Sequence, residues 1–443
     1  MNAVIIAVLV MLVLSLLRIN VVLALVTGAF IGGMVGGLGL ETTINTFTDG
    51  LGGNAAVALS YALLGAFAVG LSKTGLPDAL VEGAIKFVGT KEETRKKSLS
   101  KVLILLILLA VSIMSQNVIP VHIAFIPILI PPLLKILNEL GIDRRLTSTI
   151  ITFGLTAPYI LLPVGFGGIF HDILKTNMGE SGLDISLSSI PTAMVIPVGG
   201  MVVGLLIAVF FSYRKPRVYK QKDISEQESA AYTKKSLLFA LLAVVISLVT
   251  QVYLTEVVGV QGMIYGSLVG IVILYLGGAM KFNETDVILT SGMKMMAYIG
   301  FVMIAASGFA SVLRETGQIE TLVSSAADWI GTNQLLAAFT MLLIGLFITM
   351  GIGSSFSTIP IIAAIFVPLC AELGFSAMAT IAIVGTAAAL GDAGSPASDS
   401  TLGPTSGLNA DGQHNHIWDT CVPTFIHYNI PLIIFGCIAA MIL

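Results

Sequence analysis

Long apolar runs recur along the whole chain, and they constrain its fold more than any other feature. Residues 102–114 and 335–350 are two examples, from opposite halves of the 443 residues. A helix needs about 20 apolar residues to cross a bilayer core. Lys, Arg, Asp and Glu make up 11% of the chain, against about 25% in a typical soluble domain. The sequence therefore predicts an all-α polytopic membrane protein surrounded by the lipid bilayer.

Several function classes lose support at this stage. No basic patch interleaved with aromatic residues is present, so we predict no nucleic-acid partner. The cysteines Cys370, Cys421 and Cys437 lie in apolar segments and form neither a disulfide framework nor a metal spacing. No Walker A motif supports an ATP-driven pump. The apolar start at Ala3, without a basic region or cleavage site, favours a retained first helix over a signal peptide.

Positive charge is distributed unevenly and predicts the orientation. Most Lys and Arg residues fall in the segments 86–101, 135–145 and 214–235, and the connections between them are acidic or neutral. Basic loops are retained in the cytoplasm. An arrangement of ten spans puts every basic residue except Lys175 and Arg314 on that side, with both termini outside, in a bacterial-type inner membrane. The spans are 3–17, 20–39, 55–75, 146–165, 190–212, 236–255, 261–279, 295–313, 376–390 with a broken extension, and 420–442.

Two apolar regions, 101–137 and 335–373, remain outside these spans. Each is too short for two full spans and a loop, and each starts and ends on one side of the membrane. We interpret both as re-entrant hairpins, the first entering from the cytoplasm and the second from outside. Irregular backbone at membrane depth survives only where protein or a water-filled cavity surrounds it.

The two halves of the chain resemble each other. Residues 71–75 match 313–317, residues 115–120 match 354–360, and residues 149–154 match 380–385, in the same order. Each half has five spans, an odd number, so the second copy must be inverted. We predict a first repeat at 1–213, a basic cytoplasmic linker at 214–235 and a second repeat at 236–443. The plainer alternative is that matched Gly and Pro positions reflect helix packing alone.

Each predicted hairpin has a polar tip between apolar arms. Hydroxyl, amide and carbonyl oxygens are the hard ligands that a sodium ion prefers, and a helix N-terminus suits an anionic group. The same side chains also cap the broken helices, and capping alone is the alternative role. The candidate ion- or substrate-binding residues at the tips are Ser115, Gln116, Asn117, Ser354, Ser355, Ser357 and Thr358.

A broken helix follows each hairpin. The first, residues 152–168, contributes Thr156 and Gly165 as candidate ligands, and the second, residues 391–400, contributes Asp392, Ser395 and Asp399. A charge at membrane depth costs about 2.5–3.5 kcal/mol or more, which favours a functional reading. Burial favours the protonated form of a carboxyl group and a nearby cation favours the ionised form, so Asp392 could exchange a cation for a proton. The alternative is a cytoplasmic loop with helix-capping Asp residues.

Histidines give weaker signals. His122 lies in an arm of the first hairpin and is a candidate proton relay, although a packing role is the commoner one. His414, His416 and Asp419 have a spacing that a metal site could use, but they lie in a polar loop. We predict no metal beyond a sodium ion.

These features resemble the ion transporter superfamily, and within it the NhaC-like sodium:proton antiporter family, including relatives proposed to move amino acids. The resemblance implies that hairpin tips and broken helices form the ion and substrate sites, and that a homodimer is possible. Dicarboxylate carriers of the superfamily have Ser-Asn-Thr at both tips. Here the tips read Ser115-Gln116-Asn117 and Ser354-Ser355-Phe356, which disfavours a dicarboxylate.

The leading hypothesis is cation-coupled secondary transport by alternating access, with sodium:proton antiport first. The alternative is sodium- or proton-coupled transport of an amino acid or another small organic solute. No enzyme activity and no cofactor besides the coupling ion are predicted. An intramembrane protease would need a partner for Asp392 in another span, and none is found. A channel is the third class, and saturable counterflow would argue against it.

Overall fold

The computed structural model describes residues 2–17, 19–76, 79, 94–117, 122–220, 233–258, 260–278, 282–331, 333–352, 354–396 and 398–443. All regular elements in these ranges are helical, which confirms the predicted all-α class. The first half contains α1 (Ala3–Leu16), α2 (Val21–Val35), α3 (Gly39–Gly50), η1 (Leu51–Asn54), α4 (Ala55–Ser72), α6 (Thr94–Asn117), α7 (His122–Glu139), α8 (Arg144–Leu161), α9 (Phe166–Glu180), α10 (Ser189–Ile207) and η2 (Ala208–Ser212).

The second half begins after the linker. It contains α11 (Lys234–Tyr253), η3 (Leu254–Val258), α12 (Gly262–Leu276), α13 (Phe282–Glu315), α14 (Gln318–Ile330), α15 (Gln334–Ile352), α16 (Ser355–Glu372), α17 (Ala377–Ala389), α18 (Asp399–Leu408), η4 (His416–Cys421), α19 (Val422–Thr424), η5 (Phe425–Asn429) and α20 (Ile430–Ile442).

Six helical segments of the described residues are long and apolar enough to cross a membrane, and the bent pair α8 and α9 raises the number to seven. Other predicted spans coincide with shorter apolar helices, such as α1, α2, α12 and α17. The hairpin arm α16 has 18 residues, or about 27 Å of helix. The length of this arm therefore does not by itself distinguish a re-entrant hairpin from a full span, and the hairpin interpretation stays a prediction.

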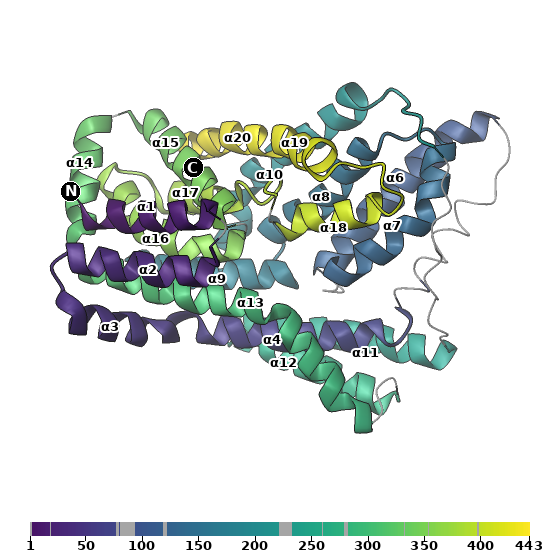
Figure 1. Cartoon of the computed structure of the whole chain (residues 1–443), viewed down its shortest axis with the longest axis horizontal. Coiled ribbons are helices and arrows are strands. Elements are labelled where there is room, and N and C mark those ends of the chain that lie inside the picture. The colour runs from purple at the N-terminus through teal and green to yellow at the C-terminus, as the bar shows by residue number, and fades with distance from the viewer. Residues whose placement is uncertain are drawn as a thin grey trace.

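The helices pack in two bundles (Figure 1). One bundle consists of α1 to α4 with α11, α12 and α13, where α13 runs along α2, α3 and α4. The other consists of α6 to α10 with α15 to α20. The bundles meet mainly where α16 packs against α13, and α14 lies against α16. We call them the long-helix bundle and the hairpin bundle.

Contacts between helices follow the order that a duplicated unit predicts. In the long-helix bundle, α1 packs on α2 as α11 packs on α12, and α2 packs on α13 as α12 packs on α4. In the hairpin bundle, α6 packs on α8 as α15 packs on α17, and α7 packs on α18 as α16 packs on α9. These exchanged pairs support two repeats. Their opposite orientation in the membrane and the boundaries at 213 and 235 remain predictions.

Proline and glycine cause the two helix breaks in the hairpin bundle. α8 and α9 meet at 46°, and the four residues between them include Pro163 and Gly165, which has φ +60°. α17 ends where Leu390 turns extended and Gly391 takes φ +87°. Only glycine enters this left-handed region without strain. Both breaks therefore have local sequence causes, and both leave backbone groups without intrahelical partners.

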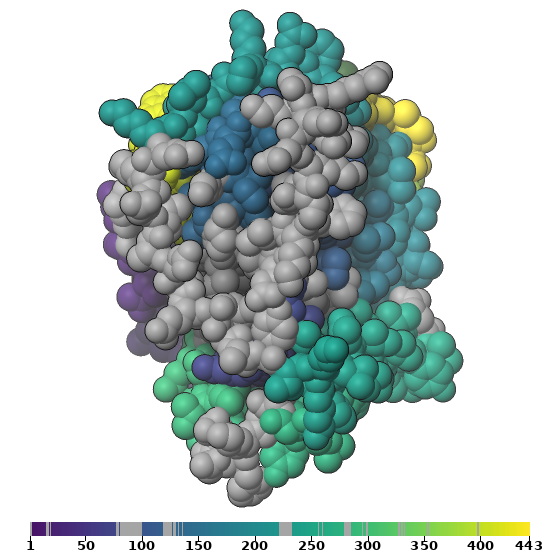
Figure 2. All heavy atoms as spheres, turned by 90° about the vertical axis from the view of Figure 1, so that its right-hand side faces the viewer, coloured from purple at the N-terminus to yellow at the C-terminus, as the bar shows by residue number. Residues whose placement is uncertain are grey.

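One end of the molecule carries the start of α6, the turn between α7 and α8, and the start of α11 (Figures 1 and 2). These segments border the three basic clusters of the sequence. Their location at one end agrees with the charge-based prediction that the clusters share one side of the membrane.

Candidate functional site

Asp392 lies in the break between α17 and α18 and is buried. Its carboxylate accepts three hydrogen bonds from hydroxyl groups: from Ser398 at 2.5 Å, from Tyr159 at 2.8 Å and from Ser400 at 3.1 Å. Ser398 is also the N-cap of α18. The carboxylate is therefore held by the start of α18 on one side and by α8 of the first half on the other.

Tyr159 connects Asp392 to the second hairpin. Its hydroxyl lies 2.8 Å from Asp392 Oδ2 and 2.7 Å from the Oγ of Ser355, the first residue of α16. Thr152, two turns earlier in α8, donates a hydrogen bond to the Ser400 carbonyl. The first broken helix therefore runs along residues 392–400, and the second hairpin tip closes the same site.

The surroundings of Asp392 supply hydroxyl donors rather than a counter-charge, as far as the structure describes them. Within the described residues, no Lys, Arg or His side chain forms an ion pair with it. Hydroxyl donors satisfy the oxygens, but a buried carboxylate without a counter-charge remains costly. A bound proton or metal cation would remove that cost. Ser355, Ser398 and Ser400 offer further oxygen atoms around the same position.

Aromatic rings cover the site on the side of the long-helix bundle. Phe356, next to Ser355 at the hairpin tip, packs against Tyr159 at 5.2 Å between ring centroids and against Phe170 at 6.0 Å. Tyr61 of α4 lies 5.8 Å from both Phe356 and Phe166. These ring contacts place apolar surface between the site and α4, and a surrounding of low polarity strengthens electrostatic interactions.

The tip of the first hairpin, residues 115–117, lies against the helix break between α8 and α9. Ser115, Gln116 and Asn117 are buried. A Cβ on Gly165 would lie 2.1 Å from the Asn117 carbonyl oxygen, so only glycine allows this approach. The side-chain oxygens of Gln116 and Asn117 find no hydrogen-bond partner in the described part of the chain. Buried acceptors without partners are rare in proteins and fit a cation or a donor group that occupies the site in use.

The remaining predicted ligands differ in burial and in the groups that they contact. Ser395 lies in the second break. Asp399, the first residue of α18, is exposed, whereas Asp392, seven residues earlier, is buried. Three other hydroxyl groups donate hydrogen bonds near their own positions in the chain. Thr156 donates to the Thr152 carbonyl, Ser357 to the Ser354 hydroxyl, and Thr358 to the Ser355 carbonyl. These bonds stay within one helix and its first turn, and the start of α16 has no side-chain capping bond. Both capping and ligand binding by these residues therefore stay predictions.

Sequence reasoning missed Tyr159, Ser398 and Ser400. Ser398 and Ser400 stand inside the polar stretch 391–400, so their hydroxyls were available as a signal. Tyr159 follows Pro158 in an apolar helix, and nothing local marks it as a partner of a residue 233 positions away. The side chain of His122 lies outside the described part of the structure, so its relay role stays a prediction.

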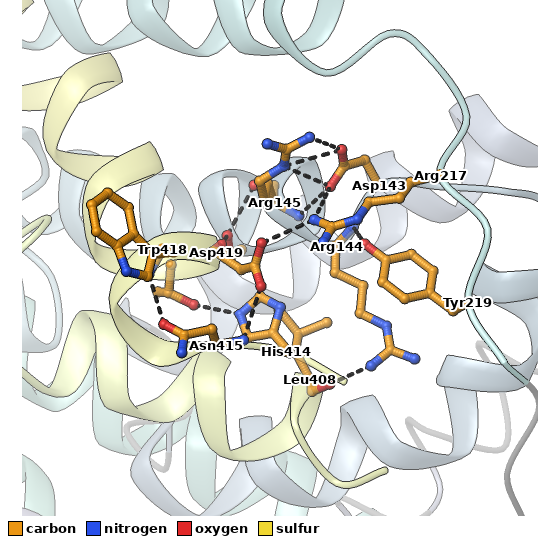
Figure 3. A network of polar contacts seen from close by, with 12 residues as sticks. Asp143, Arg144, Arg145, Arg217, Tyr219, Leu408, His414, Asn415, Trp418 and Asp419 are labelled. Carbon is orange, nitrogen blue, oxygen red and sulfur yellow. Dashed lines mark hydrogen bonds and ion pairs between the residues drawn. The ribbon is translucent and has the colours of Figure 1, made fainter. Parts of the chain in front are cut away.

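A second polar network lies where α8 begins (Figure 3). Arg144 is fully buried, and its guanidinium forms a bidentate pair with Asp411 at 2.6 Å and 2.5 Å. It also donates to the Leu408 carbonyl and lies 4.3 Å from the centre of the Tyr219 ring. Nearby, Arg217 pairs with Asp419 at 2.9 Å. The network joins α8, the first residues of the predicted linker and the loop after α18.

The histidines near this network form hydrogen bonds rather than a metal site. His414 Nε2 contacts the Thr420 hydroxyl at 2.6 Å, and His416 Nδ1 contacts the Thr405 hydroxyl at 2.8 Å. Among the described residues, no group of three or more His, Cys, Asp or Glu side chains is arranged to hold a metal ion. The spacing of His414, His416 and Asp419 therefore has a structural explanation.

His414 predicts a pH dependence of stability. Burial lowers the pKa of His414 to about 4, so this histidine stays neutral in the folded protein while the unfolded chain binds a proton below about pH 6.5. The contribution of His414 to the free energy of unfolding therefore decreases as pH falls from 6.5 toward 4, by about 2 kcal/mol between pH 7.5 and pH 5. The measurement is the free energy of unfolding at both pH values for the wild type and His414→Gln. The variant should lose less stability at pH 5, and equal losses would contradict the prediction.

Comparisons with known proteins show which families and relatives this chain resembles. The family described as "Na+/H+ antiporter family" matches residues 150–437, and the family described as "Na+-H+ antiporter family" matches residues 2–88. YuiF of Bacillus subtilis, a proposed amino acid transporter, is 66% identical over the full length of both chains. An uncharacterized membrane protein of Vibrio parahaemolyticus is 56% identical, also over both full chains.

Two solved transporters share the fold at low sequence identity. The YdaH transporter of Alcanivorax borkumensis has a TM-score of 0.61 and 13% identity, covering 90% of this chain and 88% of its own. MtrF of Neisseria gonorrhoeae, from a class of antimetabolite efflux pumps, has a TM-score of 0.60 and 14% identity, with 96% and 95% covered. At this identity the likeness establishes the fold alone.

Proposed function

The chain belongs to the Na+/H+ antiporter family, and on this basis we propose that it is a cation-coupled secondary transporter that exchanges sodium ions for protons. It is a multi-pass membrane protein of a bacterial transporter family. The observation that carries the proposal is the buried carboxylate of Asp392, which is surrounded by hydroxyl groups and has no basic partner among the described residues.

Exchange follows from competition for one carboxylate. A proton neutralises Asp392 by bonding to an oxygen, and a sodium ion neutralises it by coordination. Both cannot occupy the same oxygen, so binding of one releases the other. The hydroxyl oxygens of Ser398, Ser400 and Ser355 supply the hard ligands that a sodium ion needs after losing its water.

The bundle division supplies a means of alternating access. Asp392, both hairpins and both broken helices belong to the hairpin bundle, whereas Tyr61 and the aromatic contact on α4 belong to the long-helix bundle. Movement of the hairpin bundle against the other would carry Asp392 from one side to the other. We place the protein in a bacterial inner membrane with both termini outside, with no cofactor besides sodium and protons, and with a homodimer as the proposed assembly.

Reconstitution tests the proposal directly. Purified protein goes into proteoliposomes that contain a pH-sensitive dye, and a sodium gradient is imposed. We expect proton movement opposite to sodium, saturable in sodium concentration and absent in protein-free liposomes. Proton movement that requires no sodium would contradict the proposal. A flux that does not saturate and shows no counterflow would indicate a channel.

Amino-acid transport is a second candidate, favoured by one specific arrangement. The Tyr159 hydroxyl connects Asp392 to Ser355, the first residue of α16, by a hydrogen bond to each. A helix N-terminus attracts a carboxylate and Asp392 attracts an ammonium group, so the pair suits a zwitterion. YuiF, a proposed amino acid transporter, is 66% identical. In the same liposomes, sodium- or proton-driven uptake of labelled amino acids without direct sodium:proton exchange would favour this candidate.

A further inference from the structure

Asn429 contacts the backbone on both sides of Asp392. It is the last residue of η5, the π-helical turn before α20, and it is fully buried. Its Oδ1 accepts a hydrogen bond of 2.8 Å from the Gly391 N–H, and its Nδ2 donates one of 2.6 Å to the Ala393 carbonyl. One amide side chain therefore holds the residue before Asp392 and the residue after it.

The helix break creates the need for this contact. α17 ends at Ala389, Leu390 is extended, and Gly391 has φ +87°. Backbone groups at such an end have no intrahelical partner, and leaving one unsatisfied inside a protein costs about 1–3 kcal/mol. Asparagine offers one acceptor and one donor at short reach. Aspartate lacks the donor, and leucine lacks both.

The contact also affects Asp392, because this residue lies between Gly391 and Ala393, the two residues that Asn429 bonds. The peptide planes at 391 and 393 set the direction of the Asp392 side chain, whose oxygens meet Ser398 at 2.5 Å and Tyr159 at 2.8 Å. Hydrogen-bond geometry at these distances tolerates little rotation. π-helical turns of this kind occur frequently at functional sites.

We propose that Asn429 is the positioning residue that orients Asp392 toward its cation ligands. The inference rests on the proposed function of Asp392 as the coupling carboxylate. Asn429 itself contacts no cation. It acts through the backbone of residues 391–393, and its removal should loosen the ligand set rather than delete a ligand.

The test separates affinity from turnover. In proteoliposomes, Asn429→Ala should raise the apparent KM for sodium by about tenfold, as expected for the loss of two hydrogen bonds, and change the maximal rate by less than about threefold. A looser ligand set should also reduce the preference for sodium over lithium. Asn429→Ser keeps a neutral polar side chain but is too short to bond both Gly391 and Ala393, so it provides a second variant if the alanine protein folds poorly.

Tyr428→Phe is the matched control. Tyr428 is the neighbouring residue of η5, is fully buried, and donates a hydrogen bond of 2.6 Å to the Thr149 carbonyl, away from Asp392. This variant should lower thermal stability with an unchanged KM for sodium. If the Asn429 variants behave like Tyr428→Phe, Asn429 is structural only and the inference is wrong. Sodium dependence that survives in Asp392→Asn would instead overturn the proposed function.

Discussion

Replacing Asp392 by Asn is expected to abolish sodium-driven proton exchange while the protein still folds. The amide has the shape of the carboxylate but neither its charge nor its capacity to take up and release a proton. Loss of a charged ligand costs about 3 kcal/mol, which corresponds to a roughly 100-fold weaker affinity for the cation. The measurement is sodium-dependent proton flux in proteoliposomes, together with the melting temperature and the elution volume of the purified variant.

Asp399→Asn provides the matched control for this variant. Asp399 is seven residues further along the same break, but it is exposed at the start of α18. Its charge stabilises the N-terminus of a helix by about 0.3–1 kcal/mol, so we expect a change in flux of only a few fold. A variant set in which Asp399→Asn abolishes exchange and Asp392→Asn retains it would reverse the assignment of the coupling carboxylate.

Replacing Asp411 by Ala is expected to destabilise the protein by about 3–5 kcal/mol, because the fully buried guanidinium of Arg144 would lose its partner. The charge and hydrogen bonds of Arg144 also explain the pKa of Asp411. Burial alone would raise that pKa, but the interactions with Arg144 hold it below its ordinary value. The pair of Arg144 and Asp411 therefore stabilises the folded protein fully above about pH 4. This stabilisation is lost as pH falls further and the Asp411 carboxylate takes up a proton.

The free energy of unfolding in detergent mixed micelles is the quantity to measure. Glu180→Gln is the control, because its pair with Arg314 is partly exposed on both sides and should contribute about 1 kcal/mol or less. The double variant Arg144→Met with Asp411→Leu should recover most of the lost stability, since apolar residues can replace a buried pair. A single variant Asp411→Ala as stable as Glu180→Gln would show that Arg144 finds another partner.

Much of the fold could be predicted because its causes are local. Apolar length predicts helices in a bilayer, and Pro163, Gly165 and Gly391 predict the two breaks. The helix order also follows the repeat that the two halves suggest. The hairpins were harder to define, because an arm such as α16 is as long as a candidate span, and length cannot show how deep a helix enters the membrane.

The sequence by itself determined that this protein is a helical membrane protein with polar breaks, and that Asp392 is a charge in an apolar setting. Only the tertiary structure decided which groups surround that charge. Tyr159 reaches Asp392 across 233 residues, and Asn429 reaches Gly391 across 38. It also revealed that Arg144, one of many basic residues near a helix start, is buried against Asp411. Helix formation and helix breaking depend on neighbours in the chain, whereas these contacts depend on how distant helices pack.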